Sequence, residues 1–209
     1  MGAETLVRWR HPDKRFVPPG EFIRAAENSG MIDRLGELVL EKAVRFIAET
    51  DYVDRIAVNV SAEQFDNTYF GDRVLAVLKR YGVPPERLEL EMTESAFMDD
   101  IDAVLEKMCF LKGYGIRFSI DDFGTGFFSL NYIQKIPLEY LKIDRTFIKD
   151  LPHHHEDLAI VKTIAVGVET EKQLNTIVAI DERVIVQGYY YAKPLPGEAF
   201  LEFCKNFGG

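Results

Sequence analysis

Two adjacent carboxylates followed by a glycine-rich turn carry the clearest chemistry in this sequence. The run Ile120-Asp121-Asp122-Phe123-Gly124-Thr125-Gly126 ends a stretch of alternating β-branched and aromatic residues, so it predicts a strand that stops at the two acids. Neighbouring carboxylates repel each other unless a cation neutralises them, and glycine lets the backbone approach a ligand closely. We therefore predict a divalent-metal site here. Taken alone, the pair could also cap a helix, as we expect of Asp99 and Asp100.

Other polar side chains lie in or just after other predicted strands. They are Glu4, Asn59, Glu91 with Glu94, Lys142 with Asp144, and Gln187. Most are hard oxygen donors, which suit Mg²⁺ or Mn²⁺ rather than zinc. Lys142 and Asp144 are two residues apart, so a strand would project both from one face. A carboxylate-rich site for two metals with a nearby lysine is suited to phosphodiester hydrolysis.

Strands and helices alternate along the whole chain. The expected strands are Ala3–Trp9, Ile56–Val60, Leu88–Met92, Ile116–Ile120, Leu138–Ile143 and Val184–Val186. The expected helices are Glu21–Ser29, Ile32–Glu49, Arg73–Tyr81, Asp99–Tyr114, Glu156–Ile164, a segment after Thr170, and Glu198–Asn206. This alternation predicts a parallel sheet. We favour a closed TIM-type (β/α)8 barrel over an open sheet, because all strands of a barrel end at one mouth, where scattered polar residues can meet.

The composition is that of one globular domain over residues 1–209. The chain is 47% hydrophobic and carries a net charge of -9, which argues against DNA or RNA as a partner. Cys109 and Cys204 have neither metal-ligand spacing nor a disulfide framework, as expected in a reducing cytoplasm. The sequence contains neither a run of about 18 apolar residues nor a signal-peptide pattern at its start.

Seven short motifs occur in one order from end to end. They are Glu4-Thr5-Leu6-Val7-Arg8-Trp9, Asn59-Val60-Ser61, Glu91-Met92-Thr93-Glu94, Asp121-Asp122-Phe123-Gly124-Thr125-Gly126, Leu141-Lys142-Ile143-Asp144-Arg145, Gly167-Val168-Glu169-Thr170 and Val186-Gln187-Gly188-Tyr189. Each motif is weak alone, but their shared order makes coincidence a poor explanation. Together they resemble the EAL domain family, the cyclic di-GMP phosphodiesterases built on a TIM-type barrel. Thr5 stands where the family signature usually has Ala.

The resemblance implies a role for each matching residue. The implied metal ligands are Glu4, Asn59, Glu91 and Asp121 for one ion, with Asp122 helping to hold the second. The implied catalytic group comprises Lys142, which orients or activates water, with Asp144, Glu91, Asp121, Glu94 and Glu169. Glu94 would brace the loop Asp122–Leu130. Substrate binding is implied for Arg8, Leu6, Gln187 and Asp122, with the Arg8 guanidinium suited to a phosphate.

The resemblance also implies an activity and its partners. The expected reaction is hydrolysis of cyclic di-GMP to linear pGpG by a water activated by two metal ions, Mg²⁺ or Mn²⁺, with Ca²⁺ binding but inhibiting. A homodimer through the segment after Asp122 and upstream sensory or regulatory domains are further expectations, and those domains leave room for membrane attachment of the intact protein. Two alternatives stay open: a weak or inactive domain that acts as a cyclic di-GMP receptor or protein-interaction module, and a TIM-barrel enzyme of unrelated chemistry.

Three departures from the family pattern stand out. First, the sequence begins after the family's first strand. Secondly, the stretch from Asp144 to Gly167 is short by roughly a dozen residues, the length of part of a helix and a strand of the barrel. Thirdly, Val166 stands where a metal-supporting Glu is usual. Either residues of the protein are absent from the sequence at its start and near Ala165, or the domain is eroded. Survival of every other motif favours the first explanation.

Overall fold

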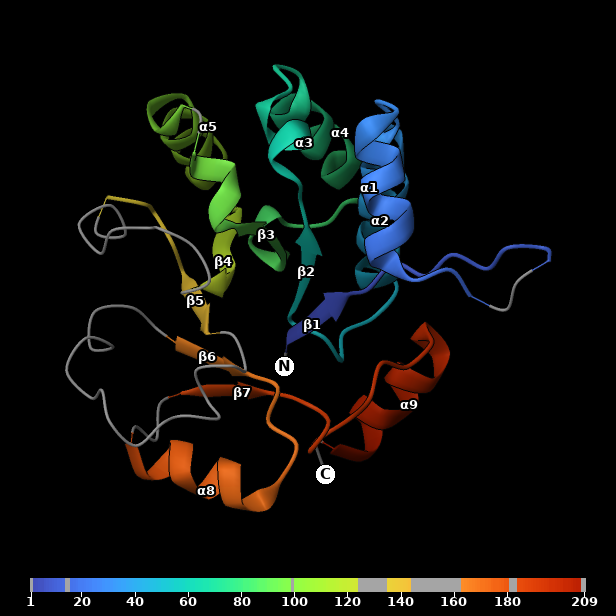
Figure 1. The fold of residues 1–209 in the computed structure, drawn as a ribbon, viewed down its shortest axis with the longest axis vertical. Helices are drawn as coiled ribbons and strands as arrows, with labels where there is room; N and C mark the ends of the chain where they lie inside the picture. The colour runs from blue at the N-terminus through green and yellow to red at the C-terminus, as the bar shows by residue number, and fades with distance from the viewer. Residues whose placement is uncertain are drawn as a thin grey trace.

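The computed structural model describes residues 2–13, 16–98, 100–123, 135–143, 163–180 and 184–207. Its centre is one sheet whose strands lie in chain order and run parallel to their neighbours. The strands are β1 (Gly2–Thr5), β2 (Arg55–Asn59), β3 (Leu88–Thr93), β4 (Arg117–Phe123), β5 (Tyr140–Ile143), β6 (Thr163–Val166) and β7 (Ile185–Gln187). Figure 1 shows these strands following one another round a curve, with the helices outside it.

Helices connect the strands and cover the outer face of the curve. They are α1 (Pro19–Asn28), α2 (Ile32–Ala48), α3 (Ala62–Asp66), α4 (Phe70–Tyr81), η1 (Pro85–Arg87), η2 (Glu94–Phe97), α5 (Ile101–Gly113), α8 (Glu171–Ile180) and α9 (Gly197–Phe207). The helices described are each too short or too polar to cross a bilayer. The predicted TIM-type architecture of strands alternating with helices is confirmed.

Alternation along the strands divides the side chains between two environments. On β3, Leu88, Leu90 and Met92 belong to the main apolar core, whereas Glu89 and Glu91 project from the opposite face. The same division on β4 places Phe118 and Ile120 in that core. A carboxylate side chain on these strands therefore points into the concave side of the curve, and the helices pack on the convex side.

The described residues form seven strands, whereas a complete TIM-type barrel has about eight. The edges of the described sheet are β1 and β7. The last helix, α9, lies close to these edges (Figure 1) and packs on α2, where the rings of Phe46 and Phe200 are 6.5 Å apart. Cys204 on α9 is 5% exposed and joins the main core. The C-terminal helix thus fastens the end of the chain to its first helical layer.

Two predicted elements are wrong in part. The first strand ends at Thr5 rather than Trp9: its last ladder pair is Thr5 with Val58, and β2 itself ends at Asn59. Trp9 instead forms an isolated antiparallel bridge with Val17.

The second error concerns the helix predicted to run through Ile164. Residues Thr163–Val166 form β6, which pairs with β5 on one side and β7 on the other. The sheet would be interrupted without a strand here, so sheet pairing overrides the local helical pattern. The shortened connection that precedes β6, residues 144–162, lies outside the described residues.

Candidate metal centre

Three carboxylates from three strands converge at the carboxyl end of the sheet. One oxygen each from Glu4 on β1, Glu91 on β3 and Asp121 on β4 lie within 4.8 Å of one another. The parallel arrangement brings this about, because all strand ends meet on one side. Glu91 is 1% exposed, which is unusual for a carboxylate. The structure thus brings together three of the residues that the sequence predicts at one site.

Lys142 on β5 supplies the positive charge at the centre of this cluster. Its Nζ lies 2.5 Å from Oε1 of Glu91 and 3.1 Å from Oε2 of Glu4. The residue is 2% exposed, so the ion pairs form almost without water. Apart from the ion pair of its Oε1 with Lys142, neither carboxylate oxygen of Glu91 accepts a hydrogen bond from the described residues.

Two side-chain amides fix the orientation of Glu4. Nδ2 of Asn59 donates to Oε1 of Glu4 at 3.0 Å, and Nε2 of Gln187 donates to Oε2 at 2.7 Å. With its Nδ2 used in this way, Asn59 has its oxygen left to face a cation. The structure thus brings Asn59 and Gln187 into the same constellation as the acids.

The pKa values show how strongly the residues interact. Burial raises the pKa of Glu91 to about 8, and the nearby Glu4 and Asp121 add to this, although Lys142 opposes it. Burial likewise raises the pKa of Asp121, helped by Asp122 and Glu4. Burial would raise the pKa of Glu4 too, but Lys142 and the bonds from Gln187 and Asn59 outweigh it and lower the value. Burial disfavours the Lys142 ammonium, yet the surrounding carboxylates raise its pKa.

The charge of the cluster fits a divalent cation. With all three carboxylates ionised, the one ammonium leaves two formal negative charges, and burial makes such a surplus costly. Carboxylate oxygens with an amide oxygen from Asn59 form the hard donor set that Mg²⁺ and Mn²⁺ prefer. The residues present therefore fit a metal of this kind.

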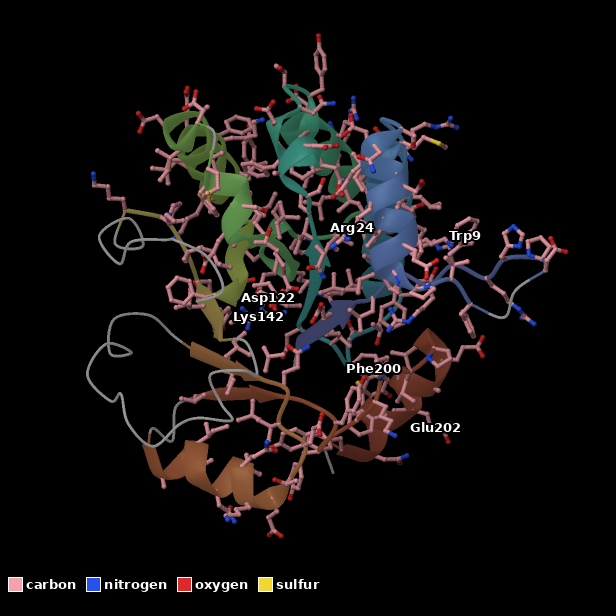
Figure 2. All side chains as sticks on the ribbon, in the orientation of Figure 1. Trp9, Arg24, Asp122, Lys142, Phe200 and Glu202 are labelled. Atoms are coloured by element: carbon pink, nitrogen blue, oxygen red, sulfur yellow. The ribbon has the colours of Figure 1, made fainter. Side chains whose placement is uncertain are left out.

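Asp122 takes a different direction from Asp121. Its φ of 53° is the only positive φ among the described non-glycine residues, and the pairing of β4 with β5 shifts register between Ile120 and Phe123. A positive φ is uncommon for a non-glycine residue, and such residues cluster at functional sites. Asp122 is exposed, and Figure 2 shows it beside Lys142 at the ends of β4 and β5. Its role toward a second metal stays a prediction.

The remaining predicted site residues lie just after strand ends or fall outside the described residues. Leu6 and Arg8 are exposed, and Nη1 of Arg8 donates to the carbonyl of Val7 at 2.9 Å. Glu94 is buried in η2, directly after β3. Glu169 is exposed, and its backbone N–H donates to Oε1 of Gln173 at 2.9 Å. Asp144, the glycines after Phe123 and the predicted dimer segment fall outside the described residues.

One group of residues near the site was missed at the sequence level. Glu89 and Ser119 are buried polar side chains, each two residues before an acid of the cluster, and Tyr140 stands in the same relation to Lys142. The sequence did hold a signal, because strand alternation puts residues two apart on one face. That Glu89 precedes Glu91 in this way should have marked a second polar layer.

The fold and the site together define a class of protein: a TIM-type barrel with a buried acid cluster at the carboxyl ends of its strands. The family model of the EAL domain matches residues 1–194. The chain belongs to the EAL domain family.

Named relatives and solved structures agree with this assignment. The bifunctional diguanylate cyclase/cyclic di-GMP phosphodiesterase MucR of Pseudomonas aeruginosa is 40% identical over 96% of this chain and 32% of its own length. The cyclic di-GMP phosphodiesterase NbdA of the same organism is 38% identical over 98% of the chain and 28% of its own length. The structure of the PaMucR phosphodiesterase with c-di-GMP has a TM-score of 0.84 and 38% identity, covering 94% of this chain and 86% of that one.

These curated relatives are much longer proteins. The chain spans between 26% and 34% of the length of the first relatives it matches.

Proposed function

We propose that this domain hydrolyses cyclic di-GMP to linear pGpG in a metal-dependent reaction. The observation that carries the proposal is the convergence of Glu4, Glu91 and Asp121 around Lys142 in a chain of the EAL domain family. The names of the relatives MucR and NbdA support the choice of substrate.

Glu4, Asn59, Glu91 and Asp121 would hold the cation, with Asp122 placed to serve a second one. Bound Mg²⁺ or Mn²⁺ lowers the pKa of a coordinated water and stabilises negative charge on the phosphoryl oxygens. The protein's own part is to hold these ligands in a dry, rigid frame. Glu91 is held by its burial, and Glu4 is held by the hydrogen bonds from the side-chain amides of Asn59 and Gln187.

Lys142 would orient the attacking water and a phosphate oxygen. Because its pKa is raised by the surrounding carboxylates, it is an ammonium at neutral pH and acts as a donor rather than as a base. The water oxygen forms a bond to phosphorus as the bond from phosphorus to the 3′ oxygen of the ribose breaks; the water loses one proton, and the 3′ oxygen gains one. The products are one linear dinucleotide with a 5′ phosphate and a free 3′ hydroxyl.

Turnover of cyclic di-GMP by the purified chain tests this proposal directly. We expect pGpG with Mg²⁺ or Mn²⁺, little with Ca²⁺, and a loss of at least about 100-fold in Glu4→Gln, which keeps the side-chain volume but removes a ligand charge. The matched control is Glu106→Gln, at an exposed position of α5. Tight binding of the dinucleotide with no pGpG would favour the receptor alternative, and full activity of Glu4→Gln would refute the site.

A further inference from the structure

A second layer of polar side chains lies directly beneath the candidate metal centre. Arg55, Glu89, Ser119 and Tyr140 come from β2, β3, β4 and β5 respectively. The last three precede Glu91, Asp121 and Lys142 by two residues, and Arg55 precedes Asn59 by four. Because side chains two or four apart on a strand share a face, this layer faces the same interior as the site above it.

The four side chains are joined to one another across all four strands. Oγ of Ser119 donates to Oε1 of Glu89 at 2.7 Å, and Nη1 of Arg55 lies 3.6 Å from Oε2 of Glu89. Nη2 of Arg55 donates to the hydroxyl of Tyr140 at 2.8 Å. The guanidinium carbon also lies 4.9 Å from the centre of the Tyr140 ring. A single guanidinium thus ties β2 to β3 and to β5.

Three of the four side chains are buried, Arg55 is half-buried, and the layer is electrically balanced. Glu89, Ser119 and Tyr140 are 6%, 1% and 5% exposed. Glu89 and Arg55 bring one charge of each sign, in contrast to the surplus of negative charge in the cluster above. A buried network of this kind is costly unless its groups are well paired, and once paired it specifies one arrangement of the strands.

Strand register connects this layer to the site. Ser119 is in register with Glu91 of β3 and with Tyr140 of β5. A shift of β4 against β3 would therefore move Asp121 relative to Glu91, and a shift of β5 would move Lys142. Groups that orient metal ligands without touching the metal are known to change metal affinity by about 10- to 100-fold.

We infer that four residues act as positioning residues: Arg55, Glu89, Ser119 and Tyr140. They hold the strands β2–β5 in the relative register that allows the acid cluster to bind a divalent cation. This inference rests on the proposed metal site. Two substitutions remove single hydrogen bonds with almost no change of shape: Ser119→Ala and Tyr140→Phe.

The test measures Mn²⁺ affinity of the purified chain by calorimetry, together with its melting temperature. Each variant should bind Mn²⁺ about 5- to 10-fold more weakly than the wild-type chain. Ile47→Val, a truncation in the main core on α2, is the control: its melting temperature should fall with unchanged Mn²⁺ affinity.

The outcomes separate this inference from the proposed function. If the wild-type chain binds Mn²⁺ and both variants bind it equally well, the positioning role is refuted and the metal site stands. If the wild-type chain fails to bind Mn²⁺, the metal site and the positioning role are refuted together. Weaker binding in Ser119→Ala and Tyr140→Phe, but not in Ile47→Val, supports the inference.

Discussion

The side-chain amide of Gln187 donates a hydrogen bond of 2.7 Å to the carboxylate of Glu4. Glu4 lies on β1 and Gln187 on β7, which are the two edge strands of the described sheet. A side-chain bond therefore spans the gap that a further strand would fill in a complete barrel. It also orients a candidate metal ligand.

Gln187→Leu should weaken both the link between the edge strands β1 and β7 and the binding of metal. A hydrogen bond to a charged acceptor stabilises by up to about 3 kcal/mol, and partial exposure of Gln187 reduces this to about 1 kcal/mol. Loss of the bond also removes one of the causes that lower the pKa of Glu4. Urea unfolding and Mn²⁺ titration measure the two effects. The control is Asn175→Ala, at an exposed position of α8. If Gln187→Leu were as stable as the wild type, the bond between Gln187 and Glu4 would not hold the two edge strands together.

Metal affinity should rise with pH up to about 8. The pKa of Glu91 is raised to about 8, chiefly by burial, so below that value the metal-free protein carries a proton that a cation must displace. Calorimetry of Mn²⁺ binding in two buffers of different ionisation enthalpy should detect proton release at pH 7 that disappears above pH 9. Binding that is independent of pH between 6 and 8 would show that Glu91 is ionised without the metal.

Asp121→Asn should stabilise the metal-free protein and abolish stabilisation by metal. Burial raises the pKa of Asp121 in the folded state above its value in the unfolded chain. The protonated side chain therefore contributes to the free energy of unfolding below the unfolded-state pKa, and this contribution is lost as the pH rises through the raised folded-state pKa. The neutral amide avoids this loss at pH 7. Melting temperatures with and without Mn²⁺ test both halves of the prediction, with Glu106→Gln as the control. A lower melting temperature without metal would contradict it.

The acids of the site, together with Asn59, Lys142 and Gln187, could be predicted from sequence, but the contacts of the polar layer beneath them could not. Glu4, Glu91 and Asp121 lie within two residues of the carboxyl ends of their strands in a parallel sheet, so topology alone brings them together. The exposed position of Asp122 depends on its positive φ and on the register shift at the end of β4, and no residue pattern predicts either of these. The partners of Glu89 come from β2 and β4, and such non-local contacts leave no local signal. β6 was missed because pairing on both sides decided its structure.

Val166→Glu should strengthen metal binding. Val166 is in register with Gln187, whose side chain reaches the site, and it lies two residues after Ile164, which is in register with Lys142. Alternation on β6 therefore points position 166 toward the cluster, while Ala165 packs in the smaller core with Ile177. Mn²⁺ affinity of the variant should rise by about 10-fold, because an added carboxylate ligand increases affinity.

The control for Val166→Glu is Val178→Glu, which makes the same change on the exposed surface of α8. It should leave Mn²⁺ affinity unchanged. Equal affinities of the two variants would show that position 166 does not face the metal centre.

Gly36→Ala should change stability differently in two backgrounds. A Cβ at position 36 in α2 would lie 1.5 Å from Nε2 of Gln64. The amide of Gln64 cannot simply swing away, because its Oε1 accepts a bond from the backbone N–H of Ser61 in the capping box of α3. Loss of such a cap costs about 1 kcal/mol. Alanine gains a similar amount over glycine in a helix interior, so the net change in the wild-type background should be small or unfavourable.

In a Gln64→Ala background the obstruction is gone, and only the helix-forming advantage of alanine remains. Gly36→Ala should then raise the free energy of unfolding by about 0.5–1 kcal/mol. Urea unfolding of the two single variants and the double variant measures the coupling between positions 36 and 64. Additive changes would show that Gly36 is not required by Gln64. Coupled changes would mean that a glycine in α2 secures the turn that follows Asn59, and with it one ligand of the candidate metal centre.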